Sequence, residues 1–178
     1  MSNLTHHIAA QLKYWRGLKG WSLDQTAQAT GISKAMLGQI ERAESNPTVV
    51  TLWKIAMGFQ TSLSSFLPDD QHNLTPLQHH EEALSVKVLQ PYDKKLGYEI
   101  LHVRLKPASK HLSCAHDQGV VEDILTLNAS LQMQIGELIY TAKPGENLRF
   151  NADQPHQYIN PHPFEVEFYN IVHYRSAV

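Results

Sequence analysis

The sequence predicts an α+β protein of two parts, a helical head followed by an all-β body. Apolar residues recur at helical spacing up to about residue 67 and alternate with polar residues at strand spacing from residue 83 onward. Between these parts, residues 68–82 contain two prolines, four acidic residues and no apolar period, which is typical of a connector. We therefore expect domains at 1–67 and 83–178, joined by a linker at 68–82.

The distribution of charge favours contact with nucleic acid by one end of the chain. Residues 1–67 hold six Lys/Arg against three Asp/Glu, a net charge of +3, whereas residues 68–178 hold nine against fourteen, a net charge of −5. The single cysteine, Cys114, excludes an internal disulfide framework and fits a reducing compartment. No apolar run is long enough for a membrane span and no leader is evident, so we expect a cytoplasmic protein that does not contact membranes.

Two short helices are expected in the head. Gly31 can form a tight turn and Ser33 can cap the helix that follows it. Ser22, with Gln25 three residues later, has the capping-box pattern that begins an earlier helix. Two short helices joined by a turn that contains glycine predict a helix-turn-helix, and the alternative is an ordinary helical hairpin.

A helix of this kind reads DNA when its outer face lies in the major groove. Lys34, Ala35 and Gln39 would then touch base edges, because lysine suits guanine O6/N7 and glutamine suits adenine N6/N7. Arg16 is a candidate for a phosphate contact, as is the helix end near Ser22. The residues expected to contact a double-stranded operator are Ser22, Gln25, Ser33, Lys34, Ala35, Gln39, Arg42, Asn46 and Thr48.

A homodimer is expected because one small head offers few base contacts, and such proteins usually bind two half-sites about one helical turn apart. The candidate two-fold interface is the run of Val166, Phe168, Asn170 and Ile171. The alternative is that these residues face only the core of the body.

Five segments of the head form a series: Trp21-Ser-Leu-Asp-Gln-Thr-Ala, Thr30-Gly-Ile-Ser-Lys, Gln39-Ile-Glu-Arg, Asn46-Pro-Thr-Val and Leu52-Trp-Lys-Ile-Ala. With this series, residues 8–67 resemble the five-helix phage-repressor (Xre-like) family. The resemblance implies five helices, of which the second and third form the helix-turn-helix and the start of the third reads bases.

The body is predicted to be an antiparallel barrel or sandwich, because residues 83–90, 98–105 and 164–174 alternate and turn signals separate them. Gly145 is followed by His156 and then Asn160, and Cys114-x-His116 is followed by Glu122. This order is similar to the two motifs of the cupin jelly-roll family. The sequence departs from those motifs at Asn151 and Asp153, at Cys114 in place of the first histidine, and in a longer spacing before Glu122.

A metal centre is the site chemistry that these residues suggest. Residues two apart on a strand share a face, so Cys114 should lie beside His116, and His156 beside Tyr158. We expect His116, Glu122 and His156 to bind a divalent metal, with Cys114 either a fourth ligand or a small buried cysteine. Zinc is expected because it brings no redox chemistry, although iron or nickel would suit the same ligands. The alternative is a cupin without metal.

Two functions are compatible with this architecture. In the first, the chain is a transcription regulator whose barrel senses a small effector, with Tyr158, Asn160 and Arg149 as candidate contacts. Three parts of the chain resemble the bacterial sulphur-utilisation regulators within the family: Ser33-Lys-Ala-Met-Leu-Gly-Gln-Ile-Glu-Arg, Thr51-Leu-Trp-Lys-Ile-Ala, and His116 followed by Gly119-Val and Glu122. This resemblance implies a sulphur metabolite or an amino acid as effector. In the second, it is a mononuclear iron enzyme, because the hydroxypropylphosphonate epoxidases of the same class combine both modules. We favour the regulator, since an enzyme would not need Lys34 and Gln39 on an outer face.

Overall fold

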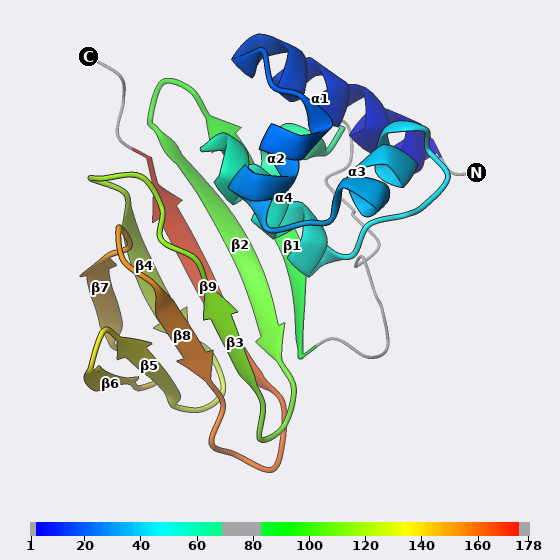
Figure 1. Cartoon of the computed structure of the whole chain (residues 1–178). Coiled ribbons are helices and arrows are strands. Elements are labelled where there is room, and N and C mark those ends of the chain that lie inside the picture. Colours follow the sequence, from blue (N-terminus) through cyan, green and yellow to red (C-terminus); the bar gives the residue numbers. More distant parts are fainter. Residues whose placement is uncertain (1–2, 69–82, 175–178) are drawn as a thin grey trace. The chain divides into compact units, whose positions relative to one another are not determined.

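The computed structural model describes residues 3–68 and 83–174 (Figure 1). The chain divides into two compact units, residues 1–73 and 74–178, and each unit is described by itself. Apart from Pro68, the expected linker at 68–82 lies outside the described residues, so its boundaries stay a prediction. None of the described helices is both long and apolar enough to cross a membrane.

The first unit is built from four α-helices and one short 3₁₀ helix. These are α1 (Asn3–Lys19), α2 (Leu23–Thr30), α3 (Lys34–Glu41), α4 (Val49–Phe59) and η1 (Leu63–Phe66). The expected count of five α-helices is therefore wrong for the described part of this unit. The last element stays a single 3₁₀ turn because Leu67 precedes Pro68, and a residue before proline is forced into the extended backbone that Leu67 has, with φ −112° and ψ 150°.

The predicted starts of α2 and α3 are confirmed by their caps. The Ser22 hydroxyl accepts a hydrogen bond from the Gln25 backbone N–H at 3.2 Å, and the Gln25 side chain accepts one from the Ser22 N–H at 2.8 Å. The Ser33 hydroxyl accepts from the Met36 N–H at 3.3 Å. Gly31 ends α2 in the left-handed region at φ 67°, where glycine has no steric penalty.

The second unit is a sandwich of two antiparallel sheets, which agrees with the expected jelly roll (Figure 1). One sheet has the order β1-β2-β9-β4-β7 and the other β3-β8-β5-β6. Inward-facing side chains from both sheets form the core between them. The strands are β1 (Leu84–Asp93), β2 (Tyr98–Leu105), β3 (Lys110–Ser113), β4 (Val121–Thr126), β5 (Leu131–Ile135), β6 (Leu138–Ala142), β7 (Asn147–Asn151), β8 (His156–Ile159) and β9 (Val166–His173).

The register of β9 corrects the expected dimer interface. Val166, Phe168 and Asn170 are fully buried, so they face the interior of the sandwich. Ile171 has the opposite orientation because side chains alternate along a strand. The alternative stated for this run, that it faces the core, is therefore correct for three of its four residues.

Candidate metal centre and nucleic-acid interface

Three segments of the barrel place the candidate metal ligands together. Glu122 lies on β4 and His156 begins β8, whereas His116 lies in the loop after β3. The His116 backbone N–H donates to the Ala152 carbonyl at 2.8 Å, which fixes this loop against the segment that leads to β8. The expectation that His116 and Cys114 share a strand face is wrong, because β3 already ends at Ser113.

The three side chains converge on one buried point. His116 Nε2 lies 2.8 Å from Glu122 Oε1, and His156 Nε2 lies 3.5 Å from the same oxygen. One nitrogen or oxygen from each residue lies within 4.8 Å of the other two. The side chains of Glu122 and His156 have no exposed surface, and that of His116 is 6% exposed. Two histidines and one carboxylate in this proximity form a ligand set for a first-row divalent metal.

The two oxygens of the Glu122 carboxylate have different surroundings. Oε2 accepts hydrogen bonds from the Tyr158 hydroxyl at 2.5 Å and from the Asn170 amide at 3.0 Å. Oε1 is buried and forms no hydrogen bond, and neither does His116 Nε2 beside it. Buried polar atoms are almost always satisfied, so an unsatisfied imidazole nitrogen 2.8 Å from an unsatisfied carboxylate oxygen fits a shared cation. Tyr158 and Asn170 therefore orient the carboxylate and leave one oxygen available.

The tautomer of His156 is set by the backbone. Its Nδ1 lies 3.0 Å from the Gln154 carbonyl, which can only accept, so Nδ1 carries the proton. In the neutral ring Nε2 then keeps its lone pair, and it faces Glu122. Histidines that bind metals usually donate their other ring N–H in this way.

Electrostatics around Glu122 favour the ionised carboxylate. Burial raises its pKa, but the neighbouring imidazoles of His156 and His116 more than reverse this and lower the pKa well below its usual range. Burial lowers the pKa of His156, but the negative charge of Glu122 raises it by more, so the net shift of this pKa is upward. The centre therefore provides a negative oxygen between two imidazoles, and a bound cation would take the place of the proton that this negative charge favours on His156.

Three other expected site residues lie elsewhere. Cys114 is exposed in the loop after β3 and is not among the converging side chains. The Asn160 amide donates to the Leu105, Lys106 and Phe164 carbonyls at 3.0, 2.9 and 2.8 Å, so it holds loops together. A ligand would find no free N–H on that amide.

Arg149 also lies apart from the centre, on the outer face of the larger sheet. Its guanidinium donates to both oxygens of Asp123, at 2.8 and 2.6 Å. Asp123 follows Glu122 on β4, so the two side chains point to opposite faces of the sheet. The guanidinium of Arg149, a candidate effector contact, is therefore paired with Asp123 on the outer face and lies apart from the centre.

Asn170 is the centre residue that sequence reasoning assigned differently. Its amide contacts Glu122 Oε2 at 3.0 Å and the Tyr158 oxygen at 3.2 Å. The sequence contains one sign of this role, because Asn170 takes the place of an apolar residue in the alternating series Val166, Phe168, Asn170, Val172 of β9. A lone polar residue in an apolar register of a strand indicates a buried partner.

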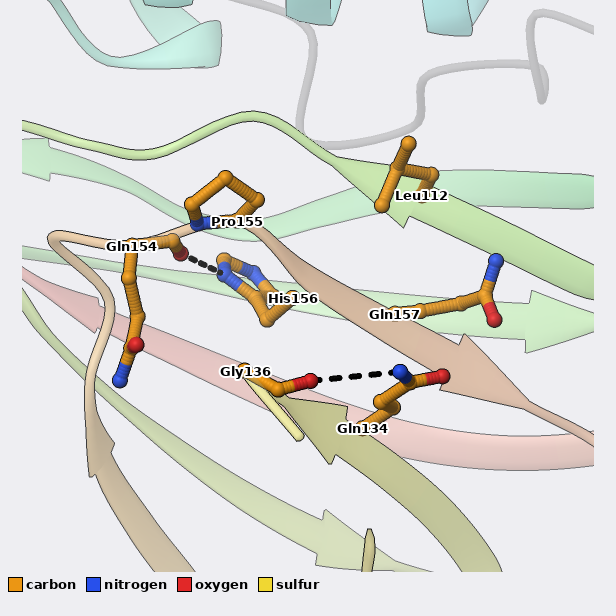
Figure 2. A pocket seen from close by; sticks show the side chains of 7 residues that line it. All are labelled: Leu112, Gln134, Gly136, Gln154, Pro155, His156 and Gln157. Carbon is orange, nitrogen blue, oxygen red and sulfur yellow. Dashed lines mark hydrogen bonds between the residues drawn. The ribbon is translucent and has the colours of Figure 1, made fainter. Parts of the chain in front are cut away.

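A pocket of about 350 Å³ borders the centre at His156 (Figure 2). Three glutamines contribute amides to it, and Figure 2 shows the Gln134 side chain bonded to the Gly136 carbonyl. Apart from His156, no lining side chain can carry charge. The lining residues are Leu112, Gln134, Gly136, Gln154, Pro155, His156 and Gln157.

The exposed face of α3 contains the three residues that are predicted to read bases. Lys34, Ala35 and Gln39 are exposed, whereas Leu37 and Ile40 are buried in the helical unit. The Lys34 ammonium lies 2.8 Å from Asp24 on α2, and both side chains are more than half exposed. An exposed pair of this kind contributes little to stability, so Lys34 can exchange Asp24 for a base or a phosphate.

Arg16 has a structural role that corrects its assignment to phosphate. Its guanidinium donates to both oxygens of the buried Glu41, at 2.6 and 3.1 Å, and to the Trp21 carbonyl at 3.0 Å. These bonds tie α1 to the end of α3. With three of its N–H groups bonded within the unit and Glu41 only 7% exposed, Arg16 holds the helices in place.

The other expected phosphate contacts remain at the surface. Arg42 is exposed and pairs with Glu44 at 2.7 Å, and Asn46 is exposed in the turn before α4. Thr48 caps α4, because its hydroxyl accepts from the Thr51 N–H at 3.1 Å.

Comparisons with known proteins agree with this two-unit architecture. The helix-turn-helix family profile matches residues 12–66. The HTH-type transcriptional regulator SutR of Escherichia coli K12 is 39% identical over 176 residues, covering 98% of both chains. The HTH-type transcriptional regulator SinR of Bacillus subtilis is 33% identical over 66 residues, covering 36% of this chain and 59% of SinR.

Solved structures extend the agreement to both units. The crystal structure of an HTH_3 family transcriptional regulator from Vibrio cholerae is 40% identical, covers 97% of each chain and superposes with a TM-score of 0.82. The cupin_2 domain of an XRE family transcriptional regulator from Enterobacter cloacae is 32% identical and covers 53% of this chain and 99% of that domain, with a TM-score of 0.51. The chain therefore belongs to the Xre-like family of HTH-type transcriptional regulators that carry a C-terminal cupin domain.

Proposed function

We propose that this regulator binds its operator through α3 and controls binding through a metal-dependent effector site in the barrel. The observation that supports the first half is the exposed row of Lys34, Ala35 and Gln39 on a helix whose other face is buried. A side chain contributes sequence preference only if it reaches base edges in the groove. Lys34 at the start of α3 carries a suitable donor, and Gln39 in its last turn carries a donor and an acceptor.

The proposed metal ligands are His116, Glu122 and His156. The observation that carries this part is the pair of buried atoms without hydrogen bonds, His116 Nε2 and Glu122 Oε1, 2.8 Å apart. A divalent cation would satisfy both atoms and the lone pair of His156 Nε2. Zinc is our first choice because these ligands suit it and a sensor needs no redox chemistry, and iron and nickel suit the same set.

Three protein ligands would leave room for a small molecule at the metal. A bound cation supplies Lewis acidity and so can hold a carboxylate, amine or thioether of an effector. Of the residues expected to contact an effector, Tyr158 touches the centre directly, through Glu122. The resemblance to sulphur-utilisation regulators makes a sulphur metabolite or an amino acid the first effector to test.

Effector binding must favour one arrangement of the DNA-binding heads over another, because equal affinity for two states shifts neither. A coupling free energy of about 1–3 kcal/mol would give a regulatory response of useful size. Two heads on one operator also require a homodimer, since each head contributes few base contacts.

The decisive experiment compares His156→Ala with His102→Ala, a histidine that pairs with Glu167 away from the centre. Metal content of the purified proteins is measured by elemental analysis, and released small molecules by mass spectrometry. We expect His156→Ala to lose metal and effector response while operator binding by the helical head survives. Full metal retention by His156→Ala would refute the site, and an effector response without metal would make the barrel a metal-free sensor.

A further inference from the structure

The strand β6 differs from every other edge of the described barrel. It is the last strand of the smaller sheet and pairs only with β5. Residues 137–141 are all exposed, and they include three large apolar side chains, Leu138, Ile139 and Tyr140. An exposed apolar edge strand is a template for pairing with another strand.

The other three edge strands carry features that block such pairing. β1 contains Lys87 and Pro91, and its register is broken twice by irregularities between Val88 and Asp93. β3 carries Lys110, and β7 carries Arg149. Charges, proline and bulges protect edges from unintended partners. Residues 138–142, which form β6, include no charged residue and no proline.

Every second residue of β6 directs its backbone N–H and C=O groups away from β5, where another strand could pair with them. A two-residue turn, Gly136-Glu137, joins β5 to β6, and Gly136 has φ 59° as a type II′ turn requires at its first position. The residues that flank such a turn, Ile135 and Leu138, exchange hydrogen bonds. Because bonded and non-bonded pairs alternate in an antiparallel ladder, Ile139 and Thr141 direct their N–H and C=O groups away from β5.

We infer that β6 pairs antiparallel with β6 of a second copy of this chain, about a two-fold axis at Tyr140. In that register Ile139 exchanges hydrogen bonds with the partner's Thr141, and each Tyr140 lies opposite the partner's Tyr140. Glu137 then lies opposite the partner's Lys143, and Lys143 opposite the partner's Glu137.

This register is selected by charge. The outward groups of Ile139 and Thr141 also permit pairings centred on either of these residues, but those pairings place Glu137 and Lys143 opposite uncharged positions. Only the pairing centred on Tyr140 places each Glu137 opposite a Lys143. Two such pairs form, one on each side of the two-fold axis, as in a self-complementary interface. Both residues are exposed, so they are accessible to a partner.

The inference deepens the proposed binding of two half-sites and rests on it, because it names the surface that joins the two heads. The two smaller sheets would form one continuous sheet across the two-fold axis. Each copy would then bring one helical head to a symmetric operator.

The first test uses charge reversal in the full chain, measured by sedimentation velocity at micromolar concentration. We expect the wild-type protein to be a dimer of the 20.2 kDa chain. Glu137→Lys and Lys143→Glu should each raise the dimer dissociation constant about tenfold, because each places like charges opposite one another twice. The double variant, with both charges exchanged, should restore the wild-type constant. Exposed Lys110→Glu on β3 is the matched control and should leave the constant unchanged.

The second test reports the register by disulfide formation in a Cys114→Ser background. Tyr140→Cys should crosslink readily under mild oxidation, because directly opposed residues of a non-bonded pair have Cα atoms about 4.5 Å apart. Leu138→Cys should not crosslink, because its two copies would be separated by about 13 Å along the strands. A dimer that is insensitive to both tests would overturn this surface while leaving two-half-site binding intact. A wild-type monomer that binds a single half-site would overturn both.

Discussion

The Tyr158→Phe substitution isolates the contribution of one hydroxyl to the candidate metal centre. Tyr158 is fully buried, and its hydroxyl donates to Glu122 Oε2 at 2.5 Å. Phenylalanine retains the ring, which stacks on Phe168, and removes the hydroxyl, which donates to Glu122 and accepts from the Asn170 amide. Glu122 would keep the Asn170 amide as its remaining hydrogen-bond donor on that oxygen, so its carboxylate would be held less firmly.

The expected loss is about 10–100-fold in metal affinity, the usual effect of removing a group that orients a ligand. A hydrogen bond to a charged group contributes about 1.5–3 kcal/mol, which corresponds to a similar range at about 1.4 kcal/mol per tenfold change. Competition with a chromophoric chelator measures the dissociation constant for Zn²⁺. Tyr169→Phe, on a partly exposed tyrosine of the outer sheet face, is the matched control. Equal affinities for the two variants would show that Tyr158 does not orient the ligand.

Three further predictions concern the head and the outer face of the barrel. Gln39→Ala should cost on the order of 1–3 kcal/mol at one operator position and relax preference there, so a uniform loss across a panel of mutated operators would contradict base reading. Gly58→Ala should destabilise the head by about 1–3 kcal/mol, because a Cβ at that position would lie 2.6–2.9 Å from α2 atoms. Gly17→Ala, with no atom within 4 Å, should be neutral or stabilising in the same thermal melts. Hydrogen bonds from Arg149, then from neighbouring side chains, lower the pKa of Asp123 to about 2 despite burial. Its stabilisation is therefore present above the ordinary pKa near about 3.9 and lost as pH falls toward about 2. Arg149→Gln should flatten the acid limb of barrel stability, and an unchanged limb would argue against the pair.

The elements of the helical head could be predicted from local sequence because their signals are local. The Ser22 and Gln25 capping box and the Ser33 cap each involve residues three apart, and both form as the sequence indicates. The fifth helix was not predictable in the same way. Its family pattern implies a helix, but Pro68 restricts Leu67 and leaves only the 3₁₀ turn at Leu63–Phe66.

The barrel was predictable as a class, while the orientation of its side chains was only partly so. Alternation places residues on two faces but does not say which face is the interior when both contain apolar residues. For that reason Phe168 and Asn170 were assigned to a surface although they lie inside. The expectation that Cys114 lies beside His116 is wrong for a different reason. The strand β3 ends one residue before Cys114, so the alternation of side chains along a strand no longer applies there.

Two consecutive residues of β4 connect the interior of the sandwich with its outer face. Glu122 and Asp123 are both buried, yet they point to opposite faces of the larger sheet. The first meets His116 and His156 inside, and the second meets Arg149 and His173 at the surface. One peptide unit joins these two residues, so the interior cluster and the surface ion pairs are positioned by the same segment of backbone. A change in the position of β4 would therefore alter the interior cluster and the surface ion pairs together.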